Sequence, residues 1–95
     1  MPKRPRIIYR THAVQRMWQR NITPEEVVCT LENGETIEEY PDGSPYPSKL
    51  LLCWTKGRPL HLVVADNQCD NTLVVITVYQ PDLQNWQTGF RKRRI

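Results

Sequence analysis

The segment Ile22–Gly34, with the sequence ITPEEVVCTLENG, decides the middle of the fold. Thr23 precedes Pro24 at the first helical position, and Glu26 follows Thr23 at the spacing of a capping box. The two positions of a hydrophobic staple are both apolar, Ile22 and Val27. The pattern therefore predicts a helix from Pro24 to about Asn33, ending at the Asn33-Gly34 pair.

A second helix and a short strand are predicted upstream of this segment. Thr11 is placed as the N-cap of a helix from His12 to about Arg20, with Asn21 as its left-handed stop. Before it, the β-prone residues within Arg6–Arg10 predict a short first strand. The N-terminal part of the chain is therefore expected to run strand, helix, helix.

Downstream of Gly34 the apolar residues change to a strand-like pattern. Four strands are predicted: Glu35–Tyr40, Lys49–Thr55, Leu60–Ala65 and Thr72–Tyr79. The expected connections are a proline-rich loop, a tight turn and a longer turn: Pro41–Ser48, Lys56-Gly57 and Asp66–Asn71. After them, Asp82–Ile95 is expected to be irregular, with Trp86 and Phe90 packing as one helical turn. The order predicts an α+β fold, in which a short N-terminal strand and two helices precede a four-strand antiparallel meander.

The length of 95 residues predicts a single domain, with a core over about 6–90 and a basic tail over 91–95. The longest apolar run, Leu50–Trp54, is far below the roughly 18 residues that span a bilayer, so no membrane association is expected. Cys29, Cys53 and Cys69 form no Cys-x-x-Cys pair, which favours a reducing cytoplasm and no disulfide. Because so small a domain buries little surface, formation of a homodimer would add stability.

The net charge of +3 is divided into blocks along the chain. Residues 1–20 carry bases and no acid, residues 21–48 carry acids and no base, and Arg91–Arg94 is again basic. Such blocks can create a one-sided potential that attracts polyanions, and Arg, more frequent here than Lys, suits bidentate phosphate contacts. The alternative is that the basic termini are solvated tails that keep the protein in solution.

The first predicted helix carries His12, Arg16 and Arg20 at four-residue steps. Residues at that spacing are neighbours on one helix face, and Ala13 and Met17 lie beside them as the expected core contact. The stripe contains no acid that would balance the arginines. It is either a site for an anion or the solvated side of an amphipathic helix.

His61 interrupts an otherwise apolar strand, and Tyr79 lies at the end of another. If Asp66–Asn71 closes a hairpin, either Thr77 or Tyr79 faces His61, depending on the register. His61 is either a working side chain or a buried, satisfied one, and Tyr79 either works or closes the core. No His or Cys pair has zinc-finger spacing, and no glycine-rich phosphate loop is present, so neither a metal nor a cofactor is expected.

Short segments spread over the chain carry a family resemblance. The upstream ones are Thr11-His12-Ala13, Arg16-Met17, Gln19-Arg20, Ile22, Glu26-Val27 and Gly34-Glu35. The downstream ones are Pro59-Leu60-His61, Val63-Val64, Ile76-Thr77-Val78-Tyr79, Pro81, Trp86 and Arg93-Arg94. Together they resemble the family catalogued as domain of unknown function 4258 over roughly Tyr9 to Arg94. In element order such domains look similar to the small RelE and BrnT ribonuclease toxins, which is a fold-level analogy.

The analogy implies metal-independent RNA cleavage, in which the ribose 2′-hydroxyl attacks the neighbouring phosphate. It implies proton transfer by three residues, His12, His61 and Tyr79. It implies RNA or phosphate binding by five arginines, Arg16, Arg20, Arg58, Arg93 and Arg94. A toxin of this kind would pair with an antitoxin-like partner protein.

Two functions therefore stay open. One is a small ribonuclease, in which His61 and Tyr79 are expected on a sheet face beside the His12–Arg16–Arg20 stripe, forming a concave basic site. The other is a non-catalytic module that uses the same basic face to bind nucleic acid or an acidic partner protein.

Overall fold

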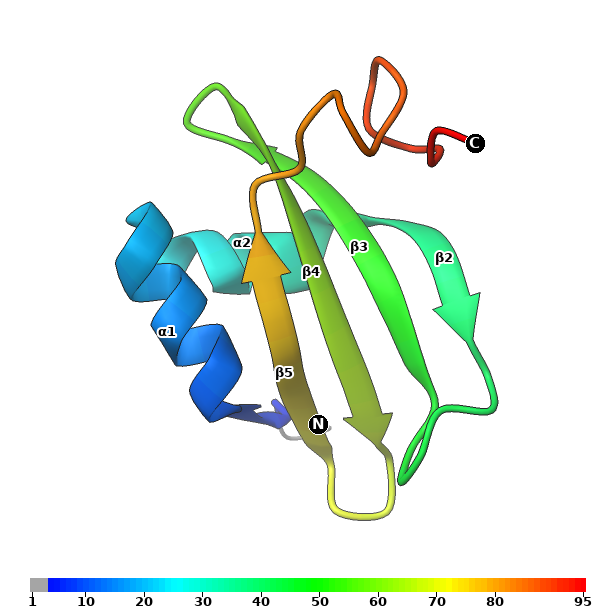
Figure 1. Cartoon of the computed structure of the whole chain (residues 1–95). Coiled ribbons are helices and arrows are strands. Elements are labelled where there is room, and N and C mark those ends of the chain that lie inside the picture. Colours follow the sequence, from blue (N-terminus) through cyan, green and yellow to red (C-terminus); the bar gives the residue numbers. More distant parts are fainter. Residues whose placement is uncertain (1–3) are drawn as a thin grey trace.

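The computed structural model of the protein describes residues 4–95 (Figure 1). Lys3, part of the predicted basic block, lies outside the described residues. The elements in chain order are β1 (Arg6–Tyr9), α1 (Thr11–Arg20), α2 (Pro24–Asn33), β2 (Glu35–Tyr40), β3 (Ser48–Thr55), β4 (Arg58–Asn67) and β5 (Thr72–Tyr79). The α+β prediction is confirmed, and the bounds predicted for α2, β2 and β5 are the observed ones.

The strands form one five-stranded sheet in the order β1-β5-β4-β3-β2. The antiparallel meander of β2 to β5 is as predicted. β1 was predicted only as a separate short strand, whereas it pairs in parallel with β5, with Ile7 opposite Leu73. This pairing covers the edge of β5, whose backbone groups would otherwise lack partners on that side.

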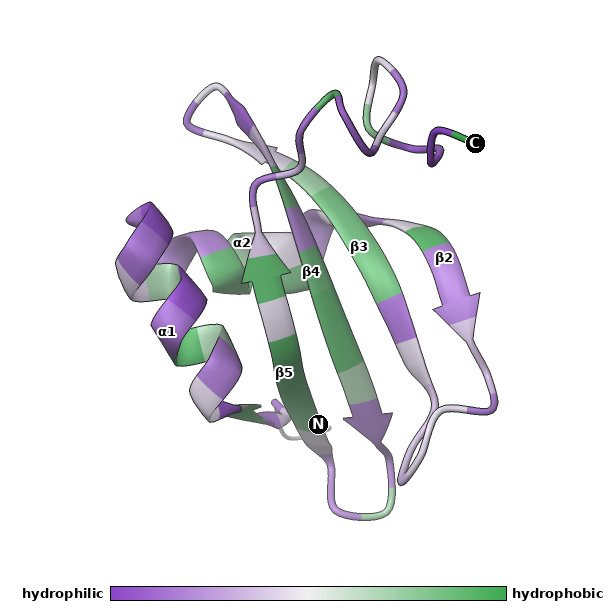
Figure 2. Ribbon diagram, viewed as in Figure 1, coloured by the Kyte–Doolittle hydropathy of each residue, from purple (hydrophilic) through white to green (hydrophobic). Residues whose placement is uncertain are grey.

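Both helices lie against the same face of the sheet (Figure 1). Leu60, Leu62 and Val64 of β4 point into this layer and pack with Ala13 of α1 and Val27 of α2. Apolar residues are concentrated along β3, β4 and β5, while α1 carries mostly hydrophilic residues with apolar ones between them (Figure 2). The main core therefore lies between the helices and the central strands.

The opposite face of the sheet is crossed by the C-terminal segment, residues 82–95, at the end where β5 stops (Figure 1). Trp86 packs edge-on against His61 of β4, and Phe90 packs against Trp54 of β3. The predicted helical turn joining Trp86 and Phe90 is wrong. Residues 85–94 fold back on themselves through a bridge between Trp86 and Arg93, because each aromatic ring has its own partner on the sheet.

The ends of the helices show which local signals act. The α2 capping box is confirmed, since the Thr23 hydroxyl accepts from the Glu26 amide at 3.2 Å and Glu26 accepts from the Thr23 amide at 3.1 Å. Asn21 ends α1 in the left-handed conformation, as predicted. The predicted cap at Thr11 is wrong: α1 begins at Thr11, and Arg10 is its N-cap without a side-chain bond. The reason is that the Arg10 amide bonds to Val75, which holds residue 10 in the extended conformation of β1.

Within the described chain, no helix has the length and apolar character needed to cross a membrane. All three cysteines are free.

Candidate functional site

A groove of about 770 Å³ separates α1 from the C-terminal segment, with the end of β5 at its base. Six predicted site residues line it: His12, Arg16, Arg20, Tyr79, Arg93 and Arg94. His61 and Arg58 do not line it. Of the described residues in the lining, Asp82 is the acidic side chain, and it already accepts hydrogen bonds from Asn85.

The α1 wall of the groove is the His12–Arg16–Arg20 stripe. Each four-residue step advances the helix by about 6 Å, so the three side chains follow one another along the groove. His12 and Arg20 are exposed and Arg16 is half-buried. Among residues 4–95, neither arginine side chain has a hydrogen bond or an ion pair, so both can bind an incoming anion.

At the base of the groove, Tyr79 connects the surface to a buried histidine. The β4–β5 register places Tyr79 opposite His61, one of the two partners that the sequence allowed. The Tyr79 hydroxyl oxygen is 3.1 Å from His61 Nδ1, and His61 Nε2 is 2.8 Å from the Phe90 carbonyl oxygen. Burial raises the pKa of Tyr79, which therefore stays protonated at neutral pH.

His61 itself is fully buried, with 0% of its surface exposed. Trp86 covers it, with the two ring centres 4.3 Å apart. Burial lowers the pKa of His61, which favours the neutral imidazole at neutral pH. His61 therefore lies with Tyr79 on the sheet face opposite the helices, beneath the C-terminal segment, and does not line the groove beside the His12–Arg16–Arg20 stripe.

The C-terminal wall of the groove is fixed by Arg93. Its guanidinium pairs with both oxygens of Glu38, at 2.9 and 3.1 Å, and lies over the Trp86 ring at 4.7 Å. The Arg93 hydrogen bonds hold the pKa of Glu38 below its ordinary value. Arg94 bonds to the carbonyls of Leu83 and Trp86. The basic tail is thus folded onto the protein, and Arg93 brings charge to the groove while already paired.

Arg58, predicted to bind phosphate, lies outside the groove. Its guanidinium donates to the carbonyls of Arg20 and Asn21, at 3.0 and 2.8 Å, and to the Glu26 carboxylate at 2.9 Å. These bonds satisfy carbonyls at the C-terminal end of α1, which have no partner within the helix. Arg58 therefore holds α1 to α2 and to β4.

Three groups that complete the site were not among the predicted site residues: Trp86, Glu38 and the Phe90 carbonyl. Trp86 belonged to the family resemblance and could have been included on that ground. Glu38 and Tyr40 alternate on β2, and the Tyr40 hydroxyl donates to Glu38. The spacing of Glu38 and Tyr40, two residues apart on one strand, is the one local signal for a polar cluster on β2. A backbone carbonyl such as that of Phe90 has no sequence signal.

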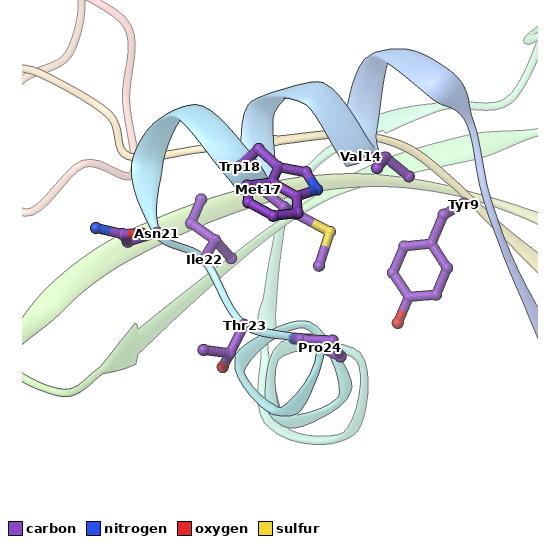
Figure 3. A pocket seen from close by; sticks show the side chains of 8 residues that line it. All are labelled: Tyr9, Val14, Met17, Trp18, Asn21, Ile22, Thr23 and Pro24. Atoms are coloured by element: carbon purple, nitrogen blue, oxygen red, sulfur yellow. The ribbon is translucent and has the colours of Figure 1, made fainter.

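On the other side of α1, a second pocket of about 700 Å³ is mainly apolar. Figure 3 shows its side chains around the hollow: Tyr9, Val14, Met17, Trp18, Asn21, Ile22, Thr23 and Pro24. Trp18 is 82% exposed at its edge. None of the described residues that line this pocket is cationic, so they lack the chemistry predicted for phosphate binding. In the part of the chain that the structure describes, no cluster of three His, Cys, Asp or Glu side chains is placed to hold a metal ion.

The fold and the groove define a small α+β protein with a basic cleft that is lined by Tyr79, the hydrogen-bond partner of the buried His61. Comparison with known protein families identifies the family of the chain. Residues 9–80 match the family described as Domain of unknown function (DUF4258), and the chain belongs to this family. No curated protein and no solved structure matches it. The family match ends before Trp86, Phe90 and Arg93, so the groups that cover His61 and form the second wall of the groove lie beyond it.

Proposed function

We propose that the protein is a metal-independent endoribonuclease that binds an RNA strand in the groove between α1 and the C-terminal segment. The observation that carries the proposal is the meeting of two unpaired arginines, Arg16 and Arg20, with two groups able to transfer protons, His12 and Tyr79, in one groove. The distant analogy to RelE and BrnT toxins agrees with this proposal through element order alone.

Binding follows from the charge of the groove. Arg16 and Arg20 are free to pair with successive phosphates, while Arg93 and Arg94 add positive potential from the opposite wall. Arg offers two parallel donors to a phosphate, so a strand held by both side chains would run along the axis of α1. Affinity should fall with added salt, since each phosphate contact releases counterions.

Cleavage follows from the position of the groove's two proton-transfer groups. In the proposed step the 2′-oxygen of ribose loses its proton and forms a bond to phosphorus, and the bond to the 5′-oxygen breaks as that oxygen gains a proton. Tyr79 and His12 are the groove residues suited to exchange these protons. Arg16 and Arg20 would stabilise the additional charge on the phosphate. His61, being buried, does not touch the RNA.

The test is incubation of the purified protein with single-stranded RNA in excess EDTA. We expect cleavage with products that end in a 2′,3′-cyclic phosphate, and no cleavage where deoxyribose replaces the ribose at the cut position. His12→Ala should lower the rate by roughly 10²-fold or more, the usual scale for loss of a general acid or base. His12 is exposed, so the variant should fold normally. RNA that is bound tightly but left intact would instead identify a non-catalytic binding module.

A further inference from the structure

The two hydrogen bonds of His61 fix which ring nitrogen carries the proton. The Phe90 carbonyl can only accept, so Nε2, at 2.8 Å from it, must be the protonated nitrogen. In a neutral imidazole Nδ1 is then an acceptor, and the Tyr79 hydroxyl, at 3.1 Å, must donate to it. The result is a directed chain from the groove: Tyr79 donates to His61, and His61 donates to Phe90.

This direction determines what Tyr79 presents to the groove. Its single hydroxyl hydrogen points to His61, so only the lone pairs of the oxygen remain for a ligand in the groove that Tyr79 lines. A hydroxyl in this arrangement accepts from an incoming O–H group. Trp86 packs against the His61 ring and keeps it out of contact with solvent, so water does not replace Tyr79 as the hydrogen-bond partner of His61.

We infer that Tyr79 is the catalytic base of the groove and that His61 is the positioning residue that orients it and takes up its proton. This inference rests on the proposed ribonuclease function. The ribose O–H bond breaks and its proton passes to the Tyr79 oxygen, while the original Tyr79 proton passes to His61 Nδ1. His61 becomes an imidazolium that still donates from Nε2 to Phe90. The 5′-oxygen takes its proton from His12, which enters the step protonated. After the products leave, the extra proton returns from His61 to the Tyr79 oxygen and passes to water, and His12 takes a proton from water, which restores all three residues.

Burial opposes the charge that His61 gains in this step and lowers its pKa, while the hydrogen bond from Nε2 to the Phe90 carbonyl acts in the other direction. Glu38 of β2 is the carboxylate that acts on the ring, and its attraction raises the pKa of His61, whereas Arg93 lowers it. Arg93 and Glu38 are themselves paired, and their effects on the pKa of His61 oppose each other. Tyr79 is the titratable group facing His61 from β5, and Leu52 is its apolar neighbour on β3.

The first test needs no RNA. Nitrogen NMR of the His61 ring at neutral pH should show a neutral Nε2–H tautomer whose Nδ1 signal shifts in Tyr79→Phe, while the tautomer is kept by Phe90. A ring protonated on Nδ1, or an Nδ1 signal unchanged in Tyr79→Phe, would overturn the proposed proton direction.

The second test is cleavage by matched variants. Tyr79→Phe should lower the rate by at least about 10²-fold with RNA affinity unchanged, whereas Tyr46→Phe, in the loop after β2 and outside the groove, should match wild type. His61→Asn retains an acceptor for Tyr79 but cannot take its proton. It should therefore cleave RNA more slowly than wild type, and its residual rate should lack the rise with pH that, in wild type, coincides with the NMR titration of His61.

The outcomes separate the two proposals. If wild type cleaves RNA and Tyr79→Phe cleaves equally well, the base assignment is wrong and the ribonuclease proposal stands. If wild type does not cleave, both fail. Should His61→Asn not fold, Tyr79→Phe and the NMR measurement decide the matter, since both leave the buried imidazole in place. If the wild-type cleavage rate does not change over the pH range in which His61 titrates by NMR, His61 takes up no proton in the reaction and its role is limited to packing.

Discussion

Glu26 should make the stability of this protein strongly dependent on acid. It is only 3% exposed, yet its carboxylate accepts from the Thr55 hydroxyl at 2.6 Å and from Arg58 at 2.9 Å. Burial by itself raises the pKa of Glu26, but the hydrogen bonds from Thr55, Arg58 and the Thr23 backbone outweigh it, and the pKa falls from 4.5 to about 2. One carboxylate therefore joins α2 to β3 and β4.

The size of the effect follows from the difference between the two pKa values. Because the pKa of Glu26 is lower in the folded state, its ionised form stabilises the fold above pH 4.5, and this contribution is lost as the pH falls towards 2. The difference, 4.5 minus about 2, is about 2.5 units. At about 1.4 kcal/mol per unit, Glu26 contributes on the order of 3 kcal/mol to the free energy of unfolding at neutral pH.

The assay is urea denaturation followed by tryptophan fluorescence between pH 7 and pH 2. Wild type should lose on the order of 3 kcal/mol more than Glu26→Gln over this range, because the variant has no carboxylate to protonate. Glu25→Gln is the matched control, since Glu25 is its exposed neighbour in the first turn of α2 and should leave the wild-type dependence unchanged. Parallel pH dependences of wild type and Glu26→Gln would refute the argument.

Two further predictions concern the groove and its cover. Arg16→Ala combined with Arg20→Ala should reduce the magnitude of the slope of log affinity against log salt for single-stranded RNA by up to about 1.4. Lys49→Ala, outside the groove, should leave that slope unchanged. Equal slopes for wild type and the double variant would show that Arg16 and Arg20 do not contact phosphates. Trp86→Ala should lower the free energy of unfolding by about 3 kcal/mol or more because Trp86 is 3% exposed. Trp18→Ala, with Trp18 82% exposed, should change it by no more than about 0.5 kcal/mol in the same denaturation experiment.

The parts of the fold that the sequence predicts well are those fixed by contacts between near neighbours. The capping box of Thr23 and Glu26 joins residues three positions apart, and α2 begins where that box predicts. The Asn21 stop acts within one helical turn in the same way. Thr11 shows the limit of such signals: its hydroxyl suited a cap, but pairing of the chain with Val75 of β5 set the start of α1 instead.

Arg58 shows why charge patterns alone misplace binding residues. In the sequence it stands in a basic stretch and looks as available as Arg16 or Arg20. Its partners, Glu26 and the carbonyls of Arg20 and Asn21, lie more than thirty positions away. Only the packing of α1 and α2 on the sheet brings these groups together. No local sequence pattern therefore distinguishes an arginine that bonds to the carbonyls at a helix end from one whose guanidinium is free to bind a ligand.

The pairing of His61 with Tyr79 depends on a single irregularity in the sheet. Near the turn, Asn67 pairs with Thr72 and Val64 with Val75, and that register continued would place Val78 opposite His61. A bulge shifts the register by one residue between Val63 and Val64, so Tyr79 faces His61 instead. Because side chains alternate between the two faces of a strand, the same shift decides that Val78 points towards the helices and that Tyr79 points to the opposite face.

The bulge also explains how β5 can place Val75 and Val78 in the core and Tyr79 at the groove. Val75 and Val78 both point into the helix-facing core although they are an odd number of residues apart, which a regular strand does not permit. The extra residue is absorbed between them, and Tyr79 then lies on the opposite face, at the strand end, where the groove begins. Alternation of apolar residues could not predict this, since Thr72–Tyr79 is β-branched on both faces. What places the Tyr79 hydroxyl on His61 is therefore a departure from strand regularity that the core itself requires.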